Sequence, residues 1–174
     1  MRSIAGAALL AIVLAGCTAA RNLTLPEHRP ADLMLAATVY TPERMVAGAG
    51  GADRLPRSLR PARYVIEADS SLRAVRGSGV DAATFPPRVT QLSTDQMETL
   101  WRQFKESGLL DPGSPSRIEA PEEAVRSASR PTAMVYASFL GRRTTLRVVL
   151  DRAGRDALEA ERLVDRLAGW AGEK

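Results

Sequence analysis

The stretch PTAMVYASFLGRRTTLRVVLD, residues 131–151, decides the fold that the sequence predicts. Apolar and polar residues alternate along its second half, which is typical of a strand with one face in a hydrophobic core. Between two such runs, at 132–140 and 143–151, Gly141-Arg142 fits a two-residue turn with glycine first. The stretch therefore predicts an antiparallel β-hairpin.

Patterns of the same kind predict three strands nearer the amino terminus. The run from Ala62 to Ala68 alternates, with Tyr64, Ile66 and Ala68 on one face. The other face holds Arg63, Val65 and Glu67, which is typical of a half-buried strand. Asp69-Ser70-Ser71 is turn chemistry, after which the chain returns as a partner strand. The predicted strands span residues 32–41, 62–68 and 72–76.

Two helices are predicted, one after each hairpin. Ser93-Thr94-Asp95-Gln96 matches a capping box, in which the serine caps the helix and the glutamine reaches back. The apolar residues that follow recur at helical spacing and form one stripe. They are Met97, Leu100, Trp101 and Phe104, and a second amphipathic helix is expected over 154–170.

These elements predict an α+β fold in the order β-β-β-α-β-β-α. We expect an antiparallel sheet of about five strands with both helices packed on one face. The repeated hairpin-plus-helix unit suggests a weak internal duplication. Prolines and glycines predict long loops at 41–59, 77–92 and 111–131.

The charge composition argues against a nucleic-acid partner. The net charge is +4 and the isoelectric point is about 9.8, yet the 24 basic residues are interleaved with 20 acidic ones. Only Lys105 and Lys174 are lysines, so the basic charge is almost entirely arginine. Charge mixed in this way is typical of a solvated surface, and we expect no nucleic acid to bind.

The first seventeen residues look like an export signal. Arg2 gives a positive start, and residues 4–14 form an apolar segment too short to span a membrane as a mature helix. Leu14-Ala15-Gly16-Cys17 resembles the lipobox of bacterial lipoproteins. The resemblance implies cleavage between Gly16 and Cys17, a diacylglyceryl thioether on Cys17, the only cysteine, and acylation of the new amino terminus.

This resemblance sets the expected organisation of the chain. Residues 1–16 would be the signal peptide, 17–31 a polar tether and 32–174 a single domain. The lipid anchor would make a membrane the first partner and place the protein in the cell envelope. The residue after the cysteine is Thr18 rather than aspartate. In this respect the chain resembles Gram-negative lipoproteins that are sorted to the periplasmic face of the outer membrane.

No catalytic constellation is visible in the sequence, and we expect no enzyme, no cofactor and no metal site. The only histidine, His28, falls in the expected tether, where a general base would not be held in place. One histidine and one lipidated cysteine cannot furnish a zinc site. A cluster of carboxylates in the predicted loop 111–131 lacks the ligand spacing of a calcium loop, and a solvated acidic loop is favoured. It comprises Glu119, Glu122 and Glu123.

An arginine repeat is the one surface pattern with a predicted role. Arg54, Arg57, Arg60 and Arg63 recur every third residue, and intervening prolines disfavour an α-helix. Polyproline II has three residues per turn, so the guanidinium groups would share one edge. Arg63 is left out because it enters a predicted strand. The edge formed by Arg54, Arg57 and Arg60 would bind an anionic lipid or an acidic envelope protein. The alternative is a loop whose arginines reflect codon usage.

Three hypotheses follow for function. The first is a lipid-anchored, non-enzymatic domain that binds another envelope component. The second is a divergent hydrolase, for which Ser70 or Ser71 would be the nucleophile without a plausible histidine partner. The third is a purely structural lipoprotein.

Overall fold

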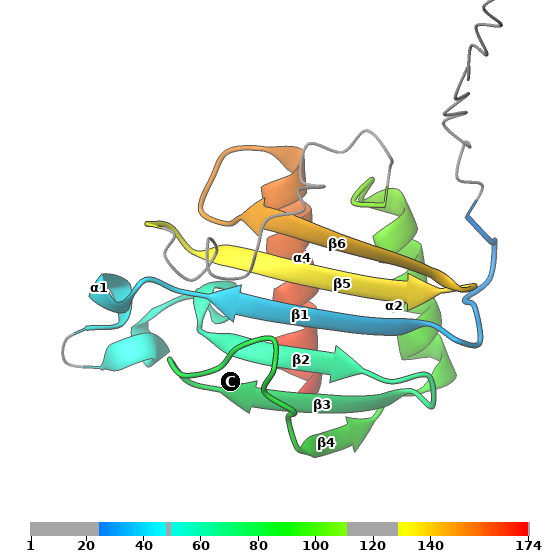
Figure 1. The fold of residues 1–174 in the computed structure, drawn as a ribbon, viewed down its shortest axis with the longest axis horizontal. Helices are drawn as coiled ribbons and strands as arrows, with labels where there is room; N and C mark the ends of the chain where they lie inside the picture. The colour runs from blue at the N-terminus through cyan, green and yellow to red at the C-terminus, as the bar shows by residue number, and fades with distance from the viewer. Residues whose placement is uncertain (1–24, 48–49, 111–128, 174) are drawn as a thin grey trace, which may run out of the picture.

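The computed structural model describes residues 25–47, 50–110 and 129–173. These residues form an α+β fold around one antiparallel sheet, which confirms the predicted class (Figure 1). The sheet has six strands in the order β4-β3-β2-β1-β5-β6. The strands are β1 (Met34–Tyr40), β2 (Ala62–Ile66), β3 (Ser71–Arg76), β4 (Arg88–Gln91), β5 (Thr132–Phe139) and β6 (Arg142–Val149).

Two long helices cover one face of this sheet, as the sequence predicts, and both lie behind it in Figure 1. They are α2 (Thr94–Glu106) and α4 (Arg155–Trp170). The predicted loop 41–59 holds short helical turns instead of irregular chain. They are α1 (Glu43–Val46) and the 3-10 turns η1 (Gly51–Arg54) and η2 (Arg57–Leu59).

The strand that the prediction missed is β4, which lies inside the expected loop 77–92. It pairs antiparallel with β3, and the register shifts between Leu72 and Arg73. Pro86 and Pro87 directly precede it. A run of four residues that follows two prolines alternates too little to predict a strand. Prolines are nevertheless tolerated beside an edge strand such as β4. The sheet therefore has six strands rather than about five.

The core lies between the sheet and the two helices. Tyr64 and Ile66 of β2 are fully buried, as their alternation predicts. The α2 stripe meets them from the helix side, with Met97, Leu100, Trp101 and Phe104 all at most 1% exposed. Its start is the predicted capping box: Ser93 Oγ accepts from Gln96 N at 3.2 Å, and Ser93 N donates to Gln96 Oε1 at 2.8 Å.

The hairpin turn between β5 and β6 is Leu140-Gly141, not the predicted Gly141-Arg142. Phe139 pairs with Arg142, and the two turn residues have φ of 49° and 68°. Positive φ at both positions is the geometry of a type I′ turn, whose twist suits a hairpin. The two possible registers differ by two residues, so both keep the same side chains on the core face. Alternation alone could not choose between them.

Part of the expected tether 17–31 is packed against the domain. The Trp101 indole donates to the Pro26 carbonyl at 3.1 Å, and Lys105 Nζ donates to the Glu27 carbonyl at 2.7 Å. Pro30 is buried. Residues 25–31 therefore belong to the folded unit, and the rest of the expected tether lies outside the described residues.

Candidate functional site

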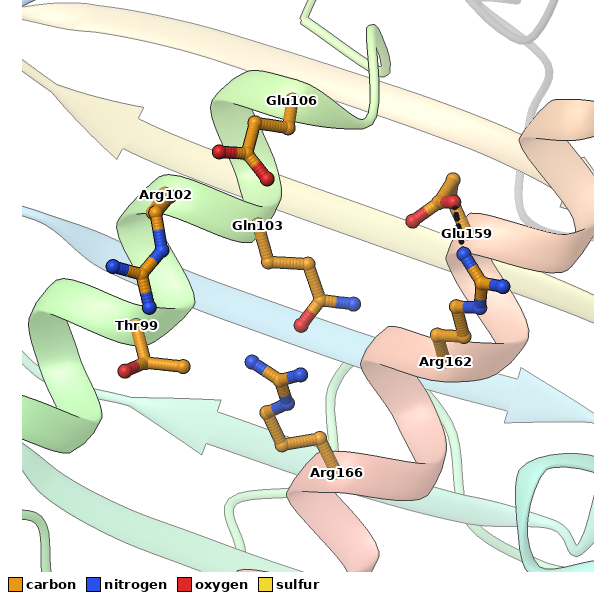
Figure 2. Close-up of a pocket in the computed structure, with 7 residues that line it drawn as sticks. All are labelled: Thr99, Arg102, Gln103, Glu106, Glu159, Arg162 and Arg166. Carbon is orange, nitrogen blue, oxygen red and sulfur yellow. Dashed lines mark hydrogen bonds and ion pairs between the residues drawn. The ribbon is translucent and has the colours of Figure 1, made fainter.

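A polar groove runs between α2 and α4 on the side of the helices that faces away from the sheet. Its volume is about 380 Å³, and it is open to solvent. Figure 2 shows its walls: α2 contributes one side and α4 the other. The lining residues are Thr99, Arg102, Gln103, Glu106, Glu159, Arg162 and Arg166.

The groove exists because each helix turns its apolar face to the sheet. Once the α2 stripe is buried, Arg102, Gln103 and Glu106 fall on the opposite and lateral faces. The α4 helix likewise buries a row of small and aliphatic residues and leaves Arg162 and Arg166 beside the groove. Antiparallel neighbours of this kind bring polar side chains of distant sequence positions together.

The charges in the groove are not all compensated. Arg162 donates to Glu159 at 2.7 Å. Within the described part of the chain, no ion pair engages Arg102 or Arg166. Gln103 Oε1 is buried and has no hydrogen-bond partner among the residues that the structure describes. In Figure 2 the Gln103 amide reaches between the helices and the Arg166 guanidinium points toward it.

This arrangement can hold an anionic group. A guanidinium presents several donors in a planar fork that fits carboxylate and phosphate oxygens. The Gln103 amide can present either its oxygen or its NH₂ group, because the two orientations are assigned from the hydrogen-bond network. Glu106 and Glu159 stand toward the far end of the groove in Figure 2, so the arginine end is the anion-binding end.

The predicted arginine edge is not polyproline II. Arg54 ends η1 and Arg57 begins η2, with only Leu55 and Pro56 extended between them. A 3-10 helix also has three residues per turn, so the period could not separate the two backbones. Because the segment turns twice, the prediction of one continuous extended edge is wrong.

Two of these arginines are used inside the molecule. Arg57 Nε and Nη2 donate to the two carboxylate oxygens of Asp165 in α4, at 3.0 and 3.2 Å, and Arg57 Nη1 donates to the Glu173 carbonyl at 3.0 Å. Arg60 donates to the carbonyls of Leu55 and Asp53. Arg54 is exposed. Binding of anions by Arg54, Arg57 and Arg60 stays a prediction, and two of them would have to leave existing partners.

A buried polar cluster that the sequence did not reveal fixes the end of the described chain. The Glu173 carboxylate is 3% exposed and accepts from the Tyr64 hydroxyl at 2.6 Å, with Arg76 3.8 Å away. Burial, and then the bond to Glu173, raise the pKa of Tyr64 above its usual value. Glu173 Oε2 is buried and makes no hydrogen bond within the described residues, so the Arg76 guanidinium, which is half exposed, is its nearest cation. The bonds to Tyr64 and Arg57 hold the segment after α4 against the domain.

The serines of the hydrolase hypothesis lie in a tight turn. Ser71 Oγ lies 2.8 Å from Glu67 Oε2 and 2.6 Å from Asp69 Oδ1. The Arg73 guanidinium and then Ser71 lower the pKa of Glu67, which makes it a poor proton acceptor. His28 is exposed on the segment before β1. The structure does not bring these residues together into a triad.

Several predicted features lie outside the described residues, namely Gly16, Cys17 and the carboxylates Glu119, Glu122 and Glu123. Within residues 25–47, 50–110 and 129–173, no group of three or more metal-ligating side chains gathers. In that same part of the chain, every helix is too short or too polar to cross a membrane.

No protein-family model and no curated protein sequence matches this chain.

Proposed function

We propose that this chain is a lipid-anchored protein of a bacterial cell envelope whose domain binds an anionic envelope component in the α2–α4 groove. The lipobox at Leu14-Ala15-Gly16-Cys17 supports the anchor. One observation carries the binding role: Arg102 and Arg166 line the same groove without a carboxylate partner among the described residues. The protein acts by binding rather than by catalysis.

The physical basis of this proposal is the free-energy cost of a buried polar group that makes no hydrogen bond. Surface arginines are often solvated singly, but Gln103 Oε1 between the helices is buried and accepts no hydrogen bond from any described residue. An unmade hydrogen bond at a buried polar atom costs about 1–3 kcal/mol. A ligand with both acceptor and donor groups, such as a monoprotonated phosphate, satisfies the guanidinium groups and the amide together.

Titration of the detergent-solubilised lipoprotein with inorganic phosphate tests this role. We expect phosphate to raise the melting temperature above that in chloride of equal ionic strength. Changing Arg102→Gln together with Arg166→Gln should weaken the apparent affinity by about tenfold or more, since charge-assisted hydrogen bonds contribute about 1.5–3 kcal/mol each.

The matched control is Arg152→Gln, which removes one exposed arginine on the loop between β6 and α4, outside this groove. It should leave the phosphate response unchanged. Equal phosphate affinity in the parent and the double variant would exclude the groove as the binding site.

A further inference from the structure

The tip of the β5–β6 hairpin is an exposed apolar point with arginines behind it. Leu140 is 59% exposed at the tip, and Arg142 and Arg143, which follow the turn, are both exposed. Leu140 also has a φ of 49°. Bulky residues rarely take positive φ, and asparagine or glycine is the usual occupant of this turn position. A leucine at this position strains the backbone, and because its side chain is exposed, packing within the described domain does not offset that strain.

This tip lies at the end of the molecule where the chain enters the domain. Contacts connect the two places: the Pro26 carbonyl accepts from Trp101, and the Trp101 ring meets the Phe139 ring edge-on at 5.3 Å. Phe139 directly precedes Leu140. Met34, the first residue of β1, pairs with Ser138 and is itself 41% exposed. Figure 1 shows the start of β1 beside the β5–β6 turn.

The position of the lipid therefore constrains this end. Only residues 18–24 separate Cys17 from Leu25, the first described residue. Even fully extended, a chain of that length reaches about 25 Å. With Cys17 in the bilayer surface, the entering segment and the hairpin tip are held close to the headgroups, where an apolar side chain followed by arginines is well placed.

We propose that the Leu140–Arg143 tip contacts the bilayer that holds the lipid anchor, with Leu140 among the upper acyl chains and the arginines among anionic headgroups. This inference rests on the proposed lipidation of Cys17. Glu27 and Asp32 of the entering segment are exposed carboxylates that limit how positive this end becomes. Leu140 consequently carries the contact, and Arg142 and Arg143 add to it at low salt.

A fluorophore can be attached to a single introduced cysteine, because the only natural cysteine, Cys17, would be blocked by the lipid. The mature lipoprotein is reconstituted into vesicles of equal parts phosphatidylglycerol and phosphatidylcholine. An environment-sensitive fluorophore is attached at Leu140→Cys, at Met34→Cys or, as control, at Ala153→Cys. Ala153 is exposed on the loop after β6, at the opposite end of the hairpin.

We expect blue-shifted emission and quenching by lipid-borne quenchers at positions 140 and 34, and emission typical of water at 153. In the Met34→Cys background, Leu140→Asp should abolish the shift. Arg142→Gln with Arg143→Gln should weaken the contact equilibrium by about fivefold per arginine at low salt. A label at 140 that behaves like the label at 153 overturns the inference.

The two proposals fail differently. Protein that does not float with the vesicles, and whose Cys17 reacts with the fluorophore, overturns the anchor and this inference with it. Protein that floats, while labels at 140 and 34 stay in water, overturns the tip contact and leaves the anchor standing.

Discussion

At the scale of single residues, Glu173 shows how a buried carboxylate can tie the segment after α4 to the sheet. Its carboxylate is removed from water and takes its hydrogen bond from the Tyr64 hydroxyl. Arg57 holds the backbone carbonyl of the same residue. Removing one partner from a buried charge is costly because the other then lacks both water and a donor. Tyr64 and Glu173 should thus contribute to stability as a pair.

The tyrosine hydroxyl predicts a specific alkaline limb in stability. Because burial raises its pKa, Tyr64 keeps its proton in the folded protein at a pH where the unfolded chain releases it. The associated stability is complete below the ordinary tyrosine pKa of about 10 and is lost as pH rises above it. Tyr64→Phe should cost about 1–3 kcal/mol at neutral pH. It should also flatten the decline at alkaline pH.

Urea unfolding of both proteins at a series of pH values from about 8 to 11 checks this, since the range brackets the ordinary tyrosine pKa. The other tyrosines are common to both proteins and cancel in the comparison. Parallel declines in the parent and the variant would show that Tyr64 is not the group responsible.

At the scale of elements, the β5–β6 turn carries strain at a known position. Leu140 and Gly141 both have positive φ, which glycine adopts freely and leucine does not. Leu140→Asn should raise the free energy of unfolding by about 1 kcal/mol, since asparagine tolerates this conformation. Gly141→Ala should lower it by a similar amount. Thermal melts of the two variants should move in opposite directions, and a lower melting temperature for Leu140→Asn would refute the strain argument.

Trp101 is the largest of the four buried side chains that pack α2 against the core. Trp101 is 1% exposed, contacts Phe139 and donates to the Pro26 carbonyl. Trp101→Ala should cost about 3–5 kcal/mol through lost burial and a cavity. Trp101→Phe keeps an aromatic ring, loses the hydrogen bond and should cost less. Chemical denaturation measures both, and equal losses would mean that the hydrogen bond, rather than packing, dominates.

Sequence patterns predicted the strands and helices better than the turns between them and the contacts among them. Tyr64 and Ile66 alternate, and Ser93 and Gln96 form a local cap, so neighbours in sequence were sufficient to predict both features. The β5–β6 turn was misplaced because two registers bury the same side chains. The groove was missed because Arg102 and Arg166 come to line the same groove only when two helices distant in sequence lie side by side. Long-range placement of that kind leaves no periodic trace in the sequence.

At the scale of the whole molecule, the proposed membrane location depends on Cys17. Cys17→Ser should prevent lipidation, because only a thiol can form the thioether, and should leave the precursor unprocessed or release it from the membrane. Mass spectrometry of the mature amino terminus and membrane fractionation measure the outcome. An unmodified Cys17 in the parent, or cleavage elsewhere, would refute the anchor and return the first seventeen residues to an ordinary export signal.

The place of β1 has a consequence for the route by which the chain reaches its native state. β1 is the first strand in sequence, yet it pairs with β2 on one side and with β5 on the other. During synthesis β1 is the first of these strands to emerge, and one of its edges has no native neighbour until residues 132–139 have followed. Pairing across so long a separation slows folding. The unpaired edge is open to other chains in the meantime, so a holdase that shields the emerging amino-terminal half should improve the yield of native protein.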